Sequence, residues 1–513
     1  MQGEGDRRRG TARAGATRRD FLRLASAVAA GSAVAAGTAL GPRPAGASVP
    51  SAHAFGGVPD PPFHFTRSSP WWMQGNYAPV GTETTGTDLP VRGRLPEELT
   101  GLYVRNSANP AHGASPDWFL GDGMLHGVRL EAGRAAWFRN RWVRTPLVAS
   151  GGNILDGRVI PGGGVNPSNT SVLFYAGVLR SLCEVGLPYA VSPDDLATVG
   201  TDDFGGRLTT AMTAHPKVDP ATGRLHFFGY GFEAPFLTYH VADPNGTLVT
   251  SQVVDIPRPT MIHDFAVTDR DVVFWDLPVV FDMGLALEGR MPFTWQPSAG
   301  ARVGVMPLGG PTSAIRWAEI EPGYVFHGTN AYRDGDDVVV DVGHLPSFYR
   351  PAGDPVSALT VRRWRIDTSG PAGSAPGFRE EILSDRQIDL PTIDRRRTGL
   401  PYRYAFYVEA ASQPGGVINW GGLVRRDTVG EAQVGWHPGR DRSAAEGLFV
   451  PAGPHAAEGE GWVLSFVYDW PSGTSELAVL DAGHLGEGPV ATVALPQRVP
   501  FGFHGTWVPS VTD

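Results

Sequence analysis

The stretch HPKVDPATGRLHFFGY (215–230) joins a histidine to a turn and then to an apolar strand. Two later stretches repeat the pattern, HDFAVTDRDVVFWD (263–276) and HGTNAYRDGDDVVVDV (327–342). In each, a histidine precedes a short segment, an Asp-containing turn follows, and a strongly apolar segment comes last. The three stretches therefore predict a repeated β-hairpin that begins with a histidine.

The rest of the chain also consists of short apolar segments separated by turn signals. Its 513 residues include 67 Gly and 45 Pro, and no long stretch shows the 3.6-residue periodicity of an amphipathic helix. We therefore expect an all-β fold, with hairpins such as 124–130 paired with 135–143. A chain this long cannot add all its strands to one open sheet. The repeated hairpins favour radial repetition, a β-propeller whose innermost strands run along one axis.

Equivalent positions in successive propeller blades converge on the axis, so the three histidines of the repeats should face one point. The C-terminal stretch PFGFHGTWVP (500–509) is unusually apolar for a chain end and supplies a fourth histidine. We expect this end to be held in place because it donates a ligand and closes the ring of blades. Four neutral imidazoles suit Fe(II), Zn(II), Cu(II) or Ni(II). The predicted ligands are His215, His263, His327 and His504.

Composition excludes several classes of function. The formal net charge is −9 and the basic residues are scattered, which argues against a nucleic-acid partner. The single cysteine, Cys183, excludes an internal disulfide framework and a thiolate metal cluster. Lys217 is the only lysine in the chain.

The N-terminus reads as a targeting segment. Thr17–Arg23 (TRRDFLR) has the twin-arginine export pattern, a stretch rich in Ala, Val and Gly follows, and Ala45–Ala47 offers a small-residue cleavage site. We predict a signal peptide over 1–47, a single exported propeller domain over 48–513, and an extracytoplasmic or secreted location. The alternative is that the N-terminal segment is retained as an anchor helix.

Several motifs, in order along the chain, resemble those of the carotenoid cleavage oxygenase family, which includes stilbene-cleaving enzymes and the retinoid isomerohydrolases. They are GNYAPV (75–80), GLYVRNSANP (101–110), WFLGDGMLHGVRL (118–130), FRNRWVRT (138–145), TAHPKVDP (213–220), MIHDFAVT (261–268), FHGTNAY (326–332) and PFGFHGTWVP (500–509). The resemblance implies a seven-bladed β-propeller with a capping layer of loops and short helices over the axial metal site. It also implies one Fe(2+) per subunit on the four histidines.

The resemblance further implies three carboxylates behind the ligands, each hydrogen-bonded to the far nitrogen of a histidine. They match Glu184, Asp389 and Glu446. Such partners fix the tautomer and orientation of a ligand ring. The family usually has glutamate where this chain has Asp389, which is one methylene shorter. Either the backbone lies closer to the metal there, a water bridges the gap, or one histidine is less firmly oriented.

The activity implied by the resemblance is Fe(II)-dependent cleavage of one C=C bond of a carotenoid or apocarotenoid by O2, giving two carbonyl products. The partners are then O2 and a small hydrophobic polyene or aromatic alkene. Peripheral contact with a membrane, from which such a substrate is taken up, is an open alternative. No side-chain acid or base is required at the reacting carbon. Candidate tunnel-lining residues, with core packing as their alternative, are Trp72, Phe281, Phe293 and Trp295.

Three alternative functions remain. Stilbene-cleaving relatives use a tyrosine and a lysine that soon follows the VRT-type segment, whereas here Arg144 and Thr145 are followed by Pro146 and Leu147. This difference favours a carotenoid substrate over a phenolic stilbene. The second alternative is a non-oxidative, iron-assisted isomerohydrolase, and the third is a non-catalytic exported propeller that binds a partner. The sequence gives no indication of the oligomeric state.

Overall fold

The computed structural model describes residues 65–66, 68–155, 166–348, 359–412 and 418–510, which all belong to one compact unit, Gly56–Asp513. The predicted twin-arginine segment and the boundary at residue 47 lie outside the described residues. Among the helices of the described part, none is long and apolar enough to cross a membrane.

Seven antiparallel sheets form the blades of a β-propeller, as predicted. Five of them have four strands in chain order, with the first strand innermost. They are blade 2 (β6 Ser171–Tyr175, β7 Val178–Leu182, β8 Tyr189–Val191, β9 Thr198–Thr201), blade 3 (β10 Lys217–Val218, β11 Leu225–Tyr230, β12 Leu237–Ala242, β13 Leu248–Val253), blade 4 (β14 Ala266–Val267, β15 Asp271–Asp276, β18 Ala301–Pro307, β19 Arg316–Ile320), blade 5 (β20 Tyr324–Asp334, β21 Asp337–Leu345, β22 Thr360–Asp367, β23 Gly377–Ser384) and blade 6 (β24 Ile388–Ile393, β25 Tyr404–Ser412, β26 Ile418–Asp427, β27 Gln433–Trp436).

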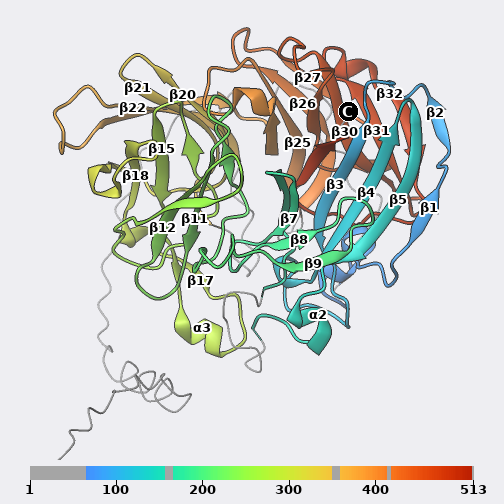
Figure 1. Cartoon of the computed structure of the whole chain (residues 1–513), viewed down its shortest axis with the longest axis horizontal. Helices are drawn as coiled ribbons and strands as arrows, with labels where there is room; N and C mark the ends of the chain where they lie inside the picture. The colour runs from blue at the N-terminus through green and yellow to red at the C-terminus, as the bar shows by residue number, and fades with distance from the viewer. Residues whose placement is uncertain (1–64, 67, 156–165, 349–358, 413–417, 511–513) are drawn as a thin grey trace, which may run out of the picture. The chain divides into compact units, whose positions relative to one another are not determined.

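The other two blades combine strands from both ends of the chain. Blade 1 has the order β1 (Thr85–Thr87), β5 (Arg134–Trp142), β4 (Gly123–Glu131), β3 (Gly101–Ala108) and β33 (Gly505–Pro509). Blade 7 has the order β2 (Val91–Gly93), β32 (Pro489–Ala494), β31 (Thr474–Asp481) and β30 (Gly461–Asp469), with β28 (Arg442–Ala444) and β29 (Leu448–Pro451) both paired to β30. The C-terminal strand β33 pairs with β3, and the N-terminal strand β2 pairs with β32. Figure 1 shows the red C-terminal strands beside the blue N-terminal ones. The chain end is therefore held by closure of the ring.

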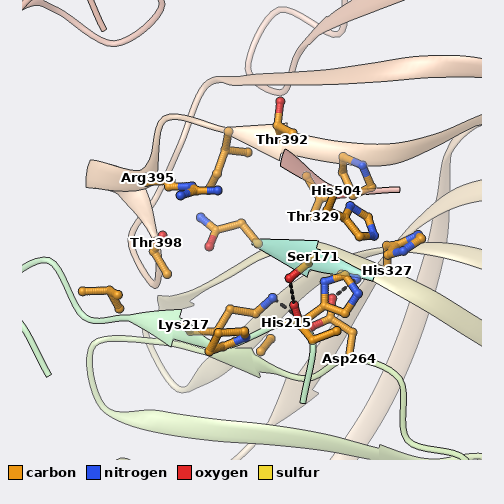
Figure 2. A pocket seen from close by; sticks show the side chains of 18 of the residues that line it. Ser171, His215, Lys217, Asp264, His327, Thr329, Thr392, Arg395, Thr398 and His504 are labelled. Carbon is orange, nitrogen blue, oxygen red and sulfur yellow. Dashed lines mark hydrogen bonds and ion pairs between the residues drawn. The ribbon is translucent and has the colours of Figure 1, made fainter. Parts of the chain in front are cut away.

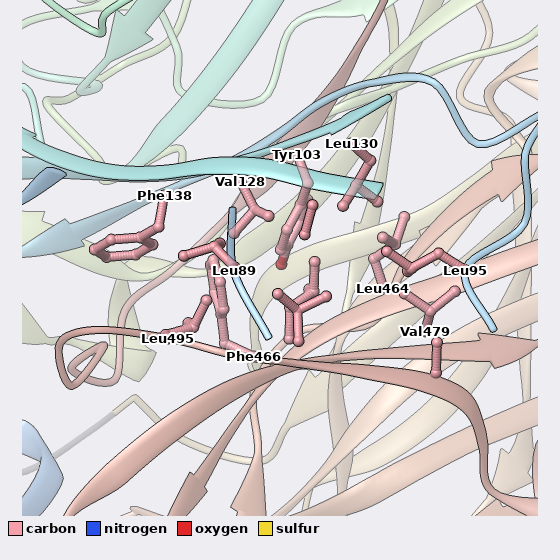
Figure 3. Packing of buried hydrophobic residues seen from close by; sticks show 14 of the residues in the cluster. Leu89, Leu95, Tyr103, Val128, Leu130, Phe138, Leu464, Phe466, Val479 and Leu495 are labelled. Carbon is pink, nitrogen blue, oxygen red and sulfur yellow. The ribbon is translucent and has the colours of Figure 1, made fainter. Parts of the chain in front are cut away.

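Apolar clusters between neighbouring blades hold the ring together. The cluster between blades 1 and 7 packs Tyr103, Val128 and Phe138 against residues such as Leu464 and Phe466 (Figure 3). Because both faces of a blade pack against neighbours, all eight residues of β3 are buried. Burying one such large apolar side chain contributes about 1.5–3 kcal/mol. This two-sided burial explains why the strands read as continuous apolar runs rather than as alternating ones.

The predicted hairpins are present. The pair predicted over 124–130 and 135–143 is β4 and β5, joined through Ala132 and Gly133, whose φ angles of 44° and 78° fit the turn that favours right-twisted strands. The histidine hairpins are β10–β11, β14–β15 and β20–β21, which open three successive blades. One detail of the prediction is wrong, because His327 lies inside β20 and not at its start. The β20–β21 register shifts between Val325 and Gly328, so His327 occupies a bulge.

The described helices are short and lie outside the blades. The hairpin of β16 (Val279–Phe281) and β17 (Phe293–Trp295) is inserted into blade 4 and carries the helix α3 (Met283–Leu287). The remaining helices are α2 (Pro146–Ser150) and the 3-10 turns η1 (Trp71–Met73), η2 (Gly75–Tyr77), η3 (Trp118–Leu120), η4 (Pro297–Ala299), η5 (Thr312–Ala314), η6 (Arg395–Arg397) and η7 (Leu485–Glu487).

Candidate metal centre

The structure brings the four predicted ligand histidines together. His215 and His263 lie just before β10 and β14, His327 lies in β20, and His504 immediately precedes β33. One potential ligand nitrogen from each ring lies within 4.8 Å of the others. The ring centroid of His215 is 4.6 Å from those of both His263 and His504. Four segments that span almost 300 residues of sequence thus present their imidazoles to one point.

Three of the four rings are held from behind by carboxylates. Nδ1 of His327 donates to Oδ1 of Asp389 at 2.8 Å, and Nδ1 of His504 donates to Oε1 of Glu446 at 2.7 Å. Nδ1 of His263 donates to Oε2 of Glu184. A proton fixed on Nδ1 leaves the lone pair of Nε2 free to bind a metal. The three carboxylates identified through the family resemblance therefore all lie behind ligand rings.

Asp389 reaches His327 directly in spite of its shorter side chain. The β24–β25 register shifts between Asp389 and Thr392, and Leu390 adopts a left-handed conformation with φ of 51°. A β-bulge of this kind re-aims a side chain. The same carboxylate oxygen of Asp389 also accepts from the backbone N–H of Leu390 at 2.8 Å. Of the three explanations considered from sequence, a bridging water is not needed, because the bond between Asp389 and His327 is direct.

The electrostatics of the cluster favour the neutral form of two of the four rings. Burial and the neighbouring histidines hold the pKa of His215 well below its usual value, and burial lowers the pKa of His327 despite the opposing effect of Asp389. Burial also opposes charge on His263, but the adjacent Glu184 raises its pKa. His215 and His327 are therefore poised as unprotonated nitrogen donors.

The donor set fits a divalent transition metal. Nε2 of His327 is buried without a hydrogen-bond partner among the described residues, and Nε2 of His215 approaches Nε2 of His263 to 3.0 Å. Buried polar atoms are normally paired, so an unpaired imidazole nitrogen aimed at three others indicates a missing partner. A cation at the centre would satisfy all four nitrogens, and an all-imidazole site suits iron, zinc, copper or nickel.

A second network, which the sequence did not reveal, ties three of the ligand segments to one another. Lys217 lies two residues after His215, and its Nζ donates to Oδ1 of Asp264, the residue after His263, at 2.8 Å. The other oxygen of Asp264 accepts from the backbone N–H of Gly328, the residue after His327, at 2.8 Å. Asp264 thus locks the relative positions of β10, β14 and β20. The available signals were the unique lysine and the carboxylate next to His263.

Two aromatic residues near the cluster also went unpredicted. The hydroxyl of Tyr230 donates to Oε1 of Glu184 at 2.7 Å, which steadies the carboxylate that holds His263. The ring of Phe326 meets His263 edge to face, with centroids 5.4 Å apart. Only the position of Phe326 next to His327 could have suggested its role.

The candidate tunnel residues fall into separate groups. Phe281 and Phe293 are cross-strand partners in the β16–β17 hairpin, and Phe281 stacks on Phe232 with centroids 3.9 Å apart. Trp295 lies in the same hairpin, opposite Val279. Trp72 instead belongs to another aromatic group, in contact with Trp71, and its indole N–H donates to the carbonyl of Ser115. The tunnel-lining role of these residues stays a prediction.

Comparison with known proteins agrees with this geometry. The family described as "Retinal pigment epithelial membrane protein" matches residues 77–509. A carotenoid cleavage oxygenase of Mycobacterium tuberculosis is 36% identical over 501 residues, covering 86% of this chain and 97% of its own length. The chain belongs to the carotenoid cleavage oxygenase family. The resemblance inferred from the sequence motifs is therefore confirmed, and the protein is an oxygenase of this family.

Two further similarities show the breadth of this oxygenase family. A carotenoid 9,10(9',10')-cleavage dioxygenase of Crocus sativus is 32% identical over 500 residues, covering 87% of this chain and 90% of its own length. The crystal structure of a lignostilbene dioxygenase of Pseudomonas brassicacearum superimposes with a TM-score of 0.79 at 28% identity, covering 86% of this chain and 98% of the other. Carotenoid and stilbene cleavage both occur among proteins similar to this oxygenase.

Proposed function

We propose that this oxygenase is an Fe(II)-dependent dioxygenase that cleaves one C=C bond of a carotenoid or apocarotenoid to give two carbonyl products. The observation that carries the proposal is the convergence of four imidazoles, three of them held through Nδ1 by buried carboxylates. The iron ligands would be His215, His263, His327 and His504. Ferrous iron at this site would supply the electron transfer that allows O2 to react with an alkene.

The protein's own groups would act by orientation and by exclusion of water. Glu184, Asp389 and Glu446 hold three rings in the tautomer that presents Nε2 to the centre. Phe326 places an apolar aromatic edge beside His263, and its ring lies 4.8 Å from that of Tyr324. An apolar wall next to a cluster of imidazoles suits a hydrocarbon double bond better than a polar group.

The position of Lys217 supports a carotenoid-type substrate over a phenolic stilbene. The resemblance associates stilbene cleavage with a lysine that holds the phenol of the substrate. Lys217 is the only lysine of this chain, and it lies in the inner strand β10, where its ammonium group pairs with Asp264. Thr145, the last residue of the VRT-type segment, caps the helix α2 (Pro146–Ser150), whose five residues include no lysine. A polyene without a phenol needs no such group.

The test is product analysis with the full chain loaded anaerobically with Fe(II). The protein is incubated with a panel of apocarotenoids and hydroxystilbenes under 18O2, and the products are analysed by mass spectrometry. We expect two carbonyl products from a polyene, each carrying one 18O atom. Labelling of one product only would indicate monooxygenation, and turnover without O2 consumption would indicate an isomerohydrolase. Selective cleavage of the stilbenes would reverse the substrate assignment.

We also propose export by the twin-arginine route, on the strength of the Thr17–Arg23 motif. Replacing Arg18 and Arg19 by lysine keeps the charge and removes the specific pair. We expect the wild-type protein outside the cytoplasmic fraction and the double variant inside it. Equal distribution of the two proteins would contradict the proposal.

Peripheral membrane contact is a further part of the proposal. The helix α3 exposes Met283 and Leu287 to 39% and 50% next to the aromatic β16–β17 hairpin. Exposed apolar groups on a short projecting element are suited to insertion at a lipid interface. We expect vesicle binding that weakens in a Met283→Ser, Leu287→Ser variant but not in Val429→Ser, which changes an exposed valine in another blade.

A further inference from the structure

A cavity of about 190 Å³ lies between the innermost strands of the seven blades, and the proposed cleavage reaction assigns no role to its charged side chains. Every blade contributes residues from its innermost strand, from Ser171 in β6 to Gly505 in β33. The rings of His215, His327 and His504 also line the cavity, so it reaches the candidate metal centre. In Figure 2 these histidines lie on one side of the cavity, and Arg395 and Thr398 lie on the other.

Both carboxylates that line the cavity already accept hydrogen bonds on each of their two oxygens. Both oxygens of Glu446 accept, from Nδ1 of His504 and from the N–H of Gly505, each at 2.7 Å. Asp264 accepts from Lys217, from Gly328 and from the N–H of Phe265. Both carboxylates are almost fully buried, at 2% and 1% exposure. The charge of Asp264 is therefore paired with that of Lys217, whereas Glu446 is held by a histidine ring and a backbone N–H.

The two cations of the lining retain unused donors. Nζ of Lys217 has three N–H groups and uses one on Asp264. Arg395 donates to the hydroxyl of Thr506 at 2.6 Å and to the carbonyl of Gly505 at 3.2 Å, both neutral acceptors. It forms no ion pair with any carboxylate in the described part of the chain. Its neighbours in η6 differ, because Arg396 pairs with Asp394 and Arg397 pairs with Glu458.

Among the residues that line the cavity, Arg395 is the one whose side chain is exposed to solvent. A guanidinium presents five donors in a planar fork that matches a carboxylate in a bidentate arrangement. The hydrogen-bonding groups of the cavity that remain unused thus include N–H donors on the positive side chains of Arg395 and Lys217. Its volume accommodates a group of a few heavy atoms.

We propose that the axial cavity is a binding site for a small planar carboxylate-type anion, such as formate or bicarbonate, held by Arg395 and Lys217. An anion there would lie beside three of the four histidine rings, and it would reach the site along the propeller axis. The site is built into the protein and does not depend on the identity of the substrate.

The test is calorimetric titration of the full-length, metal-free protein with sodium formate at constant ionic strength. We expect saturable binding of one formate per chain. Arg395→Gln and Lys217→Met should each weaken it about tenfold, because each removes a charge-assisted hydrogen bond. Arg395→Lys should weaken it less, since the charge remains. Arg397→Gln is the matched control in the same turn and should bind as the wild type does.

Repeating the titration with Co(II)-loaded protein separates this site from direct metal ligation. We expect the same order of affinities among the variants, with a small change in the Co(II) absorption bands. Absence of binding to the metal-free protein would overturn the proposal. Equal binding by Arg395→Gln and the wild type would also overturn it, provided that the circular dichroism of the two proteins agrees. Neither result bears on the proposed cleavage reaction, which is measured by its products.

Discussion

Exchanging each carboxylate behind the ligands for its amide should weaken metal binding unequally. Each oxygen of Glu446 accepts a hydrogen bond, one from Nδ1–H of His504 and the other from the N–H of Gly505. An amide has only one oxygen and cannot accept both bonds in this arrangement. In Glu446→Gln the amide NH2 must face one of the two donors. The backbone donor cannot change, so the imidazole of His504 would adopt the other tautomer. Its proton would then occupy Nε2 and block the lone pair that the metal needs.

Asp389→Asn is the informative comparison. A single oxygen, Oδ1, accepts from both His327 and the N–H of Leu390. The asparagine oxygen can keep both bonds and point its NH2 elsewhere, so only the charge is lost. A neutral bond in place of a charged one costs about 1 kcal/mol, or about fivefold in metal affinity. For Glu446→Gln, the loss of an oriented ligand predicts a decrease of about 10–100-fold, equal to about 1.4–2.7 kcal/mol.

The assay is anaerobic competition for Fe(II) or Co(II) against a chromophoric chelator, supported by 15N spectra of labelled histidine to assign the tautomer of His504. Glu97→Gln, at an exposed ion pair with Arg94, is the control and should match the wild type. The reasoning is refuted if Glu446→Gln binds metal as well as Asp389→Asn does. It is also refuted if His504 keeps its proton on Nδ1 in the glutamine variant.

Three further predictions follow from the same contacts. His504→Ala should abolish stoichiometric metal retention measured by elemental analysis, whereas His484→Ala, at an exposed ion pair with Asp481, should retain the metal; loss in both would contradict the assignment. Tyr230→Phe removes a donor to Glu184 and should lower metal affinity up to about tenfold, while Tyr324→Phe removes a buried hydroxyl with no hydrogen-bond partner among the described residues and should not. Burial lowers the pKa of three other histidines from the ordinary value of 6.5 to about 4. Between pH 6.5 and about 4, these side chains therefore bind protons in the unfolded chain but not in the folded one. The metal-free protein should therefore lose stability in urea as the pH falls from 6.5 to about 4, and a flat profile would refute this. These histidines are His226, His240 and His344.

The sequence alone determined the repeating unit and the four converging histidines. A histidine, a turn and an apolar strand recur at His215, His263 and His327, and these features are local enough to be read from a single stretch of chain. The family motifs then supplied Glu184, Asp389 and Glu446, which composition and spacing did not single out. The apolar C-terminus indicated that the chain end is fixed, and β33 in blade 1 accounts for it.

Only the tertiary structure decided how these pieces meet. The bulges that place His327 inside β20 and bring Asp389 to it depend on the register between strands. The bonds from Lys217 through Asp264 to Gly328 cross three blades, and Arg395 lines a cavity to which all seven inner strands contribute. Local preferences specify a strand or a turn within a few residues. Contacts between blades depend instead on how apolar faces far apart in sequence pack around a closed ring.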